Sequence, residues 1–224
     1  MFLNPPRCRQ RVAKPGCRGR TAALRFLEGC PGNARSENHR KLYKTIILDY
    51  NMSIGIITGT NRYDSFSEKI AGYYAERLAE RNISHEVIAL KNLPQNFIFS
   101  QMYGQSDPAF SAFQEKIDAH EKLLFVIPEY NGSFPGVLKA FIDALRHPDS
   151  FSRKKIALVG VSSGAYGNAV GLSHFSDVLA YLNADILGLR LKLANIMTHF
   201  SDGAFTFEVY ARFVERQIDT FVAF

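Results

Sequence analysis

The sequence predicts an α/β fold, a three-layer sandwich in which helices cover both faces of a five-stranded parallel sheet. Three observations lead to this prediction. Five short apolar runs have the length and composition of buried strands. Segments with apolar residues at helical spacing separate them, so strands and helices alternate from residue 53 to the end of the chain. Polar, glycine-rich loops follow the first, third and fourth runs, where open α/β sheets bind ligands.

The first elements are predicted as follows. A strand is expected at residues 53–58, whose letters are SIGIIT. A helix follows at residues 65–81, because apolar residues recur there every three or four positions. Residues 85–90 are the second strand, and residues 91–107 form a long connection. The helix at residues 108–120 begins with a proline, which suits a first helical turn.

The later elements repeat this alternation. The third strand is the apolar run LLFVI with the lysine before it, and a Pro-Gly pair opens the helix that comes next. The fourth strand, KIALVGV, precedes a glycine-rich loop and another helix. The remaining predicted elements are strands at residues 122–127, 155–161 and 185–191 and helices at residues 136–145, 170–182 and 205–221.

Strands that alternate with helices form mostly parallel sheets covered on both faces. Right-handed crossovers leave few possible topologies. The strand order expected for five strands is 2-1-3-4-5, which is the order of flavodoxin-like sandwiches.

The charge of the chain is unevenly distributed. The net charge is +6, but residues 1–51 hold 11 of the 27 basic residues and only 3 of the 21 acidic ones. The remaining 16 basic and 18 acidic residues give residues 52–224 a net charge of −2. This part of the chain has no basic excess to bind nucleic acid, so we expect no nucleic-acid partner. No apolar run approaches the roughly 20 residues of a membrane span, so we expect no membrane partner.

The sequence divides into a basic N-terminal extension, residues 1–51, and an α/β domain, residues 52–224. The extension lacks helical or strand periodicity until Leu42 and is expected to be disordered. It is open to three interpretations: a targeting or interaction arm, a weak binder of anionic partners, or sequence upstream of a true start at Met52, which we favour. All three cysteines lie in the extension. A domain without disulfides fits a reducing compartment, so we expect a cytoplasmic protein.

The loop after the first strand, GTNRYDSFS at residues 59–67, has the composition of a phosphate site. Thr60, Ser65 and Ser67 supply hydroxyls, and Arg62 supplies a cation. The N-terminus of the following helix adds free N–H groups. The loop matches neither a Walker loop nor a dinucleotide Gly-x-Gly-x-x-Gly pattern. The simpler alternative is that one of the serines only caps the helix.

The loop after the third strand belongs to the segment PEYNGSFPGVLK at residues 128–139. Its prolines stiffen the turn, and its glycines allow the backbone to approach a ligand. A purely structural turn explains Pro135 and Gly136 but gives no role to Tyr130 and Asn131. The loop after the fourth strand, GVSSGAYGN at residues 160–168, is a third polar loop at the same predicted edge. Each loop alone is a weak signal, and their convergence is the argument for a site.

A flat aromatic ligand with a terminal phosphate fits three such loops, and FMN is a molecule of this kind. The chain from Met52 onward resembles the NADPH-dependent FMN reductase family of flavodoxin-like proteins, which includes flavin, quinone and azo reductases. Residues 59–67 are similar to the family pattern Gly-Ser-x-Arg-x-x-Ser-x-Ser/Asn, with Thr60 in place of serine. Residues 128–139 match Pro-x-Tyr-Asn-x-Ser-x-Pro-Gly-x-Leu-Lys throughout, and residues 162–167 match Ser-x-Gly-x-x-Gly. A second glycine commonly follows in the family, whereas this chain has Asn168.

The resemblance implies an FMN-dependent oxidoreductase. It would pass a hydride from NADPH, or NADH, through FMN to a small-molecule electron acceptor such as a flavin or quinone. The residues implied to bind the FMN phosphate are Thr60, Arg62, Ser65 and Ser67. Those implied to line the flavin ring are Pro128, Glu129, Tyr130, Asn131, Gly132, Ser133, Ser162 and Gly164. No side chain is needed as an obligatory acid or base, so no catalytic residue is assigned.

Other functions are weighed against this one. A flavodoxin-like electron carrier or redox-sensing module is the main alternative, although flavodoxins are usually more acidic than a domain of net charge −2. The letters GVSSG match a hydrolase elbow, but no acid and histidine follow in the expected order. The histidines are scattered, so we expect no metal site. The long connection carries apolar residues that we expect to be exposed, Phe97, Phe99, Met102 and Tyr103. They suggest a cover for the flavin or a subunit contact in a homodimer or homotetramer.

Overall fold

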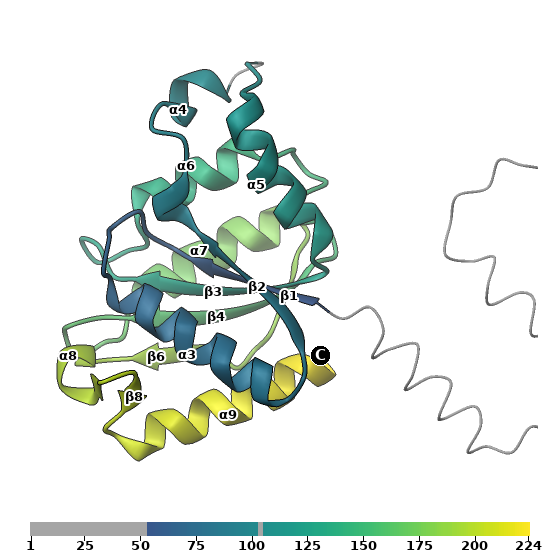
Figure 1. The fold of residues 1–224 in the computed structure, drawn as a ribbon. Helices are drawn as coiled ribbons and strands as arrows, with labels where there is room; N and C mark the ends of the chain where they lie inside the picture. Colours follow the sequence, from purple (N-terminus) through teal and green to yellow (C-terminus); the bar gives the residue numbers. More distant parts are fainter. Residues whose placement is uncertain (1–52, 103–104) are drawn as a thin grey trace, which may run out of the picture. The chain divides into compact units, whose positions relative to one another are not determined.

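The computed structural model describes residues 53–102 and 105–224 (Figure 1). The N-terminal extension predicted at residues 1–51, with its three interpretations, lies outside the described residues, as does Tyr103.

The described strands form a parallel sheet in the order β2-β1-β3-β4-β5, with β6 also paired to β4 (Figure 1). This is the strand order predicted from the sequence. The strands of the sheet are β1 (Ser53–Thr58), β2 (Ser84–Ala89), β3 (Lys122–Pro128), β4 (Lys155–Val161), β5 (Asp185–Ile186) and β6 (Leu191–Leu193). The main helices are α3 (Phe66–Glu80), α5 (Pro108–Ala119), α6 (Gly136–Ala144), α7 (Ala169–Tyr181) and α9 (Glu208–Ala223).

The sheet is buried on both faces because successive residues of its strands point in opposite directions. In β3, Leu123 and Phe125 pack with α5, α6 and α7, whereas Leu124 and Val126 pack with α3 and α9. Figure 1 shows the same division, with α3 and α9 on the opposite side of the sheet from α5, α6 and α7. Two apolar clusters therefore sandwich the sheet, which explains why its central strands are apolar at every position.

The predicted last strand, residues 185–191, is not continuous. Leu187 N–H donates to the carbonyl of Ile156 at 2.8 Å, but the chain then turns locally, with Arg190 N–H donating to the Gly188 carbonyl at 3.1 Å. Pairing with β4 resumes only at Leu191. The strand is therefore split into β5 and β6, because a tight turn diverts the backbone from the ladder.

The predicted last helix also begins later than expected. A hairpin of β7 (Phe200–Ser201) and β8 (Ala204–Phe205) precedes it, following the short helix α8 (Ile196–His199). Asp202 and Gly203 form its turn with φ values of 50° and 77°. An Asp-Gly pair is a strong hairpin signal, and it was available in the sequence.

The long connection at residues 91–107 contains a 3₁₀ turn, η1 (Leu90–Asn92), and the short helix α4 (Phe97–Ser100). The expectation that its apolar residues are exposed is wrong for Phe97 and Met102, which are buried. Phe97 stacks on Phe110 of α5 with ring centroids 5.8 Å apart. Phe99 alone of the described apolar residues named for this segment is exposed, at 79%.

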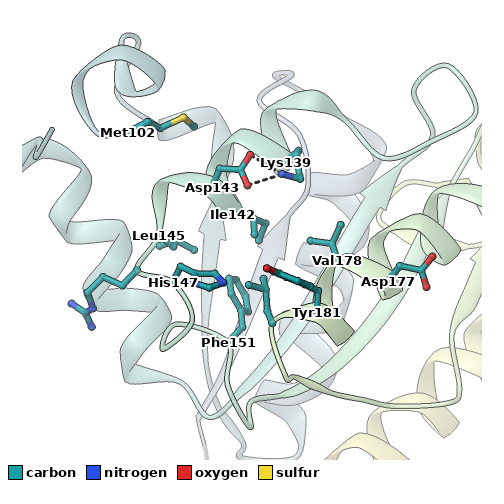
Figure 2. A pocket seen from close by; sticks show the side chains of 12 residues that line it. Met102, Lys139, Ile142, Asp143, Leu145, His147, Phe151, Asp177, Val178 and Tyr181 are labelled. Carbon is teal, nitrogen blue, oxygen red and sulfur yellow. Dashed lines mark hydrogen bonds and ion pairs between the residues drawn. The ribbon is translucent and has the colours of Figure 1, made fainter. Parts of the chain in front are cut away.

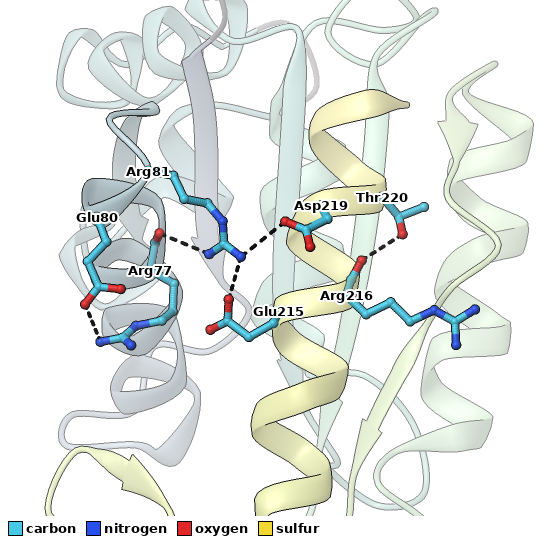
Figure 3. A network of polar contacts seen from close by, with 7 residues as sticks. All are labelled: Arg77, Glu80, Arg81, Glu215, Arg216, Asp219 and Thr220. Atoms are coloured by element: carbon cyan, nitrogen blue, oxygen red, sulfur yellow. Dashed lines mark hydrogen bonds and ion pairs between the residues drawn. The ribbon is translucent and has the colours of Figure 1, made fainter.

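A polar network joins α3 to α9 (Figure 3). One Nη of Arg81 donates to Glu215 at 2.5 Å and to Asp219 at 3.2 Å, and the other donates to the carbonyl of Arg77 at 3.2 Å. Beneath this network, the Tyr74 hydroxyl donates to Gln217 Oε1 at 2.6 Å. These contacts hold the two helices that cover one face of the sheet.

Candidate functional site

Three loops converge at one edge of the sheet. They follow β1, β3 and β4, which are neighbours in the parallel order and end at the same edge. The strand order reverses between β1 and β3, because β2 lies on one side of β1 and β4 on the far side of β3. Such a switch point, at the carboxyl ends of parallel strands, is where doubly wound folds bind ligands.

The loop after β1 is anchored to the neighbouring strand. Gly59 N–H donates to the Val126 carbonyl at 2.8 Å. A Cβ at Gly59 would lie 3.1 Å from that carbonyl oxygen and 3.2 Å from Ile127 Cα. Glycine therefore allows this loop to start close against β3. The loop ends at Ser65, whose side chain caps α3 by accepting from Glu68 N–H at 3.2 Å.

Two polar side chains, one in this loop and one in the first turn of α3, have no hydrogen-bond partner in the described part of the chain. The Ser67 residue is only 1% exposed, and its buried hydroxyl has no hydrogen-bond partner. The Arg62 side chain is exposed, and no ion pair among the described residues engages its guanidinium. A buried hydroxyl without a partner costs free energy. The start of α3 therefore presents a hydroxyl, a guanidinium and the free N–H groups of a helix N-terminus, which together suit a phosphate.

The loop after β3 is a tight turn. The backbones of Tyr130 and Ser133 exchange hydrogen bonds of 2.9 and 3.1 Å. Between them, Asn131 and Gly132 have φ values of 53° and 73°, which is typical of a type I′ turn. Asn131 and Gly132 are exposed at its tip. The Asn-Gly pair thus forms the turn itself.

The loops after β1 and β3 are joined by their side chains. The hydroxyls of Tyr130 and Thr60 share a hydrogen bond of 2.9 Å. Thr60 Oγ1 also accepts from Arg62 N–H at 3.2 Å. Thr60 is buried, so its hydroxyl is occupied in linking the two loops and in shaping the turn that presents Arg62.

The loop after β4 is closed on itself by Ser162. The Ser162 hydroxyl donates to the Gly164 carbonyl at 2.8 Å and accepts from Gly167 N–H at 2.9 Å. Gly164 and Tyr166 are exposed, and the Tyr166 ring is 76% exposed. Ser162 therefore shapes the loop with its side chain, while the exposed residues offer backbone groups and an aromatic face to a ligand.

The structure thus brings most of the predicted site residues into one connected set. Tyr130 links two loops, and Glu129 joins the third by accepting from Asn168 N–H at 3.1 Å. Sequence reasoning gave no role to Asn168 or to His174, whose Nδ1 hydrogen-bonds the Ser133 hydroxyl at 2.9 Å. The signal for Asn168 was its position, where the family pattern has glycine.

A cavity of about 660 Å³ lies apart from these loops, between the later halves of α6 and α7 (Figure 2). Ile142, Phe151 and Val178 are among the apolar residues that line it, and Lys139 and Asp143 form an ion pair at its rim. None of the predicted site residues lines this cavity. The convergent polar groups, rather than cavity size, therefore identify the candidate site.

Two further findings concern the described residues alone. No cluster of three or more His, Cys, Asp or Glu side chains among them is arranged to hold a metal ion. No helix in this part of the chain has the length and apolar character needed to cross a membrane.

Comparison with known proteins identifies relatives of this chain. The family model for NADPH-dependent FMN reductase matches residues 52–191. A 2-hydroxy-1,4-benzoquinone reductase of a Burkholderia species is 36% identical over 136 residues, which cover 59% of this chain and 72% of that protein. An FMN-dependent NADPH-azoreductase of Staphylococcus aureus is 31% identical over 153 residues, covering 66% of this chain and 78% of that protein.

Solved structures show the same fold at lower identity. A flavoenzyme NAD(P)H:acceptor oxidoreductase from Paracoccus denitrificans is 22% identical with a TM-score of 0.63, covering 77% of this chain and 96% of that one. A flavodoxin from Pseudomonas aeruginosa is 16% identical with a TM-score of 0.51, covering 77% of this chain and 97% of that one. These likenesses confirm the predicted flavodoxin-like sandwich.

Proposed function

Because the chain belongs to the NADPH-dependent FMN reductase family, we propose that the loops after β1, β3 and β4 form its FMN site. The loop after β1 and the start of α3 take the phosphate. The loops after β3 and β4 take the flavin ring, and a quinone is the electron acceptor. The observation that carries this proposal is the unpaired, buried Ser67 hydroxyl at the start of α3, together with the unengaged Arg62 in the loop before it.

The donors at the start of α3 fit a phosphomonoester. Ser67 Oγ lacks a partner, and a phosphate oxygen satisfies it. Arg62 supplies the planar fork of donors that matches phosphate geometry. Lys91 lies 5.7 Å from the Tyr63 ring centroid but is paired with Glu68, so Arg62 is the cation that remains free for a phosphate.

The other two loops present backbone groups to a ring. The I′ turn at Asn131 and Gly132 and the exposed Gly164 place peptide groups at the edge of the sheet without bulky side chains over them. Peptide N–H groups that are fixed in position stabilise negative charge that develops on a bound molecule. When bound, FMN supplies the hydride chemistry that links a reduced nicotinamide to an acceptor.

The proposed acceptor class follows from the relatives and from one exposed side chain. A relative 36% identical to this chain is named as a reductase of a hydroxylated benzoquinone. Tyr166 exposes its aromatic ring on a loop assigned to the flavin, and stacked aromatic pairs favour planar ligands. A quinone that stacks on Tyr166 reaches the flavin edge from the solvent side.

A second copy of the chain is proposed to cover the surface around the cavity of Figure 2. Tyr181, at its rim, is 77% exposed, and Ile98 and Phe99 of α4 are also exposed. Around them Lys139 and Arg146 are matched by Asp143 and Asp177, so two copies meet without net repulsion. If a homodimer buries these residues, the double variant Phe99→Asp, Tyr181→Asp is expected to sediment as a monomer. Unchanged sedimentation contradicts this surface.

A cytoplasmic location is also proposed, because residues 52–224 contain no cysteine and such a domain needs no oxidising compartment.

The phosphate assignment is tested by comparing FMN with riboflavin, which lacks the phosphate. Arg62→Ala and Ser67→Ala are expected to weaken FMN binding roughly tenfold or more and to leave riboflavin binding unchanged. Arg216→Ala is the matched control, since Arg216 is exposed on α9 and its guanidinium makes no hydrogen bond or ion pair within the described residues. Flavin fluorescence reports both affinities. Equal effects on FMN and riboflavin, or none on either, overturn the assignment.

NADPH oxidation by the FMN-loaded protein with a benzoquinone tests the activity. Turnover supports the reductase, whereas flavin binding with slow NADPH oxidation supports the electron-carrier alternative.

A further inference from the structure

The residue at the junction of the β4 loop and α7 is unusual. Asn168 has no exposed surface, and its backbone is left-handed, with φ 60° and ψ 37°. Glycine adopts this conformation most easily, and asparagine is among the few side-chain residues that tolerate it. A buried amide at such a position needs partners, so its hydrogen bonds indicate what it does.

Asn168 makes three hydrogen bonds to the end of β3. Its Nδ2 donates to the carbonyls of Ile127 and Pro128, both at 3.1 Å, and its backbone N–H donates to Glu129 Oε2 at 3.1 Å. The Asn168 carbonyl accepts from Leu172 N–H at 3.0 Å, which starts α7. One residue therefore ties the loop after β4 to the strand end that leads directly into the loop after β3.

The chain around Asn168 is built for close approach. A Cβ at Gly171 would lie 2.1 Å from Asn168 Oδ1 and 2.7 Å from the carbonyl carbon of Ser133. A Cβ at Gly160 would lie 2.2 Å from the Gly167 carbonyl oxygen and 3.1 Å from Asn168 Cβ. The first turn of α7 thus packs directly on the loop after β3, with Asn168 between them.

We propose that Asn168 is a positioning residue that fixes the two ring-binding loops relative to each other and thereby sets the reduction potential of the bound flavin. This inference rests on the proposed FMN site. Peptide dipoles stabilise added negative charge only as well as their positions are held before that charge arrives. If the loop is free to shift, its peptide groups stabilise the negative charge of the reduced flavin less well. Binding of reduced flavin is then weakened more than binding of oxidised flavin.

The matched control is Gln217. Its amide is also fully buried and also donates to two backbone carbonyls, those of Leu158 at 3.1 Å and Leu189 at 2.8 Å. It lies on α9, on the side of the sheet away from α7. Gln217→Ala removes two equivalent donor bonds, together with the bond that Gln217 Oε1 accepts from the Tyr74 hydroxyl, without touching either loop. A general loss of stability therefore affects both variants, and a loss of positioning affects only the variant at Asn168.

The experiment compares the wild-type protein with Asn168→Gly, Asn168→Ser and Gln217→Ala. Glycine keeps the left-handed backbone without strain, whereas serine retains one donor but is strained in this conformation. Four quantities are measured: the unfolding temperature, amide hydrogen exchange of residues 129–133 in the apoprotein, the FMN dissociation constant, and the flavin reduction potential against dyes of known potential.

In Asn168→Gly we expect exchange of residues 129–133 to accelerate roughly tenfold or more, since the two hydrogen bonds from Nδ2 to the end of β3 are lost. Oxidised FMN is expected to bind roughly tenfold more weakly. Reduced FMN loses about a further tenfold, which lowers the two-electron potential by about 30 mV. Gln217→Ala is expected to lower the unfolding temperature and to leave the other three measurements unchanged.

A failure of the proposed FMN site can be told apart from a failure of the inference about Asn168. If the wild-type protein binds no FMN, the proposed function is refuted, and hydrogen exchange still shows whether Asn168 holds the loop. If wild-type FMN binding is normal and Asn168→Gly shifts neither exchange nor potential beyond Gln217→Ala, the inference is overturned. If Asn168→Gly does not fold, Asn168→Ser decides the same question.

Discussion

The hydrogen bond between Thr60 and Tyr130 is expected to couple the phosphate loop to the ring loop. It joins two hydroxyls at 2.9 Å across residues 70 positions apart in the sequence. Tyr130→Phe removes one of its members, and Thr60→Val removes the other. If the link holds the two loops in the geometry that FMN needs, each substitution weakens FMN binding, and the double variant loses the shared bond only once.

The size of each effect follows from the partners left behind. In Tyr130→Phe, Thr60 Oγ1 still accepts from Arg62 N–H at 3.2 Å, so no polar atom is orphaned. The expected loss is about 1 kcal/mol, or about fivefold in the dissociation constant. Thr60→Val removes the acceptor of Arg62 N–H as well, and the expected loss is about 2 kcal/mol. The coupling between the two substitutions is then about 1 kcal/mol.

The assay is a double-mutant cycle on the FMN dissociation constant, measured by flavin fluorescence. Tyr63→Phe is the matched control, because Tyr63 lies in the same loop, is 72% exposed and makes no hydrogen bond through its hydroxyl within the described residues. The FMN affinity of Tyr63→Phe should equal that of the wild-type protein. Additive losses in the cycle, with a coupling below about 0.3 kcal/mol, refute the view that this bond connects the two halves of the site.

Three other predictions concern the scaffold. Burial raises the pKa of Tyr74 well above its ordinary value of 10.0. The stability that the un-ionised Tyr74 contributes is therefore full below pH 10 and is lost as the pH rises further. Tyrosinate absorbance should show this residue ionising only when the protein unfolds. Burial favours a higher pKa for Glu86, but hydrogen bonds from Lys116 and His120 outweigh it and hold the pKa below its ordinary 4.5. The resulting stability is present above pH 4.5 and lost as the pH falls through the lowered pKa, so Glu86→Gln should flatten the acid limb of the pH–stability curve; an unchanged limb contradicts this. Arg81→Met removes the bridge from α3 to Glu215 and Asp219 on α9 and should cost about 1 kcal/mol of unfolding free energy, measured by urea denaturation, with a smaller loss in high salt; a salt-independent loss points to packing instead.

Much of the fold was predictable from local patterns. The third strand is a continuous apolar run because both faces of a central parallel strand are covered, and the run at residues 122–127 became β3 with one more residue at its end. The split between β5 and β6 was not predictable from such patterns. Leu187 and Leu191 are both buried, so the apolar letters look alike on either side of a turn that interrupts the ladder.

The burial of Phe97 and Met102 was missed for a related reason. A long connection is usually exposed, and nothing local shows that α4 packs against α6, where Gln101 Nε2 donates to the Ala144 carbonyl at 3.2 Å. Gln101 and Ala144 are 43 positions apart in the sequence. Local composition predicts whether a segment is regular, but it does not predict what that segment packs against.

The site, like the fold, depends partly on local patterns and partly on tertiary contacts. By itself, the sequence determined that three polar, glycine-containing loops follow strands of a doubly wound sheet, because turn chemistry and apolar periodicity are local properties. It also identified the family through the motif at residues 128–139. Only the tertiary structure decided which polar side chains hold the loops together and which remain without a partner. The Ser162 hydroxyl and the Tyr130 hydroxyl are used in internal hydrogen bonds, Ser67 is left unpaired, and Asn168 ties β3 to α7. Hydrogen bonds between residues about 40 and 70 positions apart exist only once the strands have brought those residues together, so no local pattern encodes them.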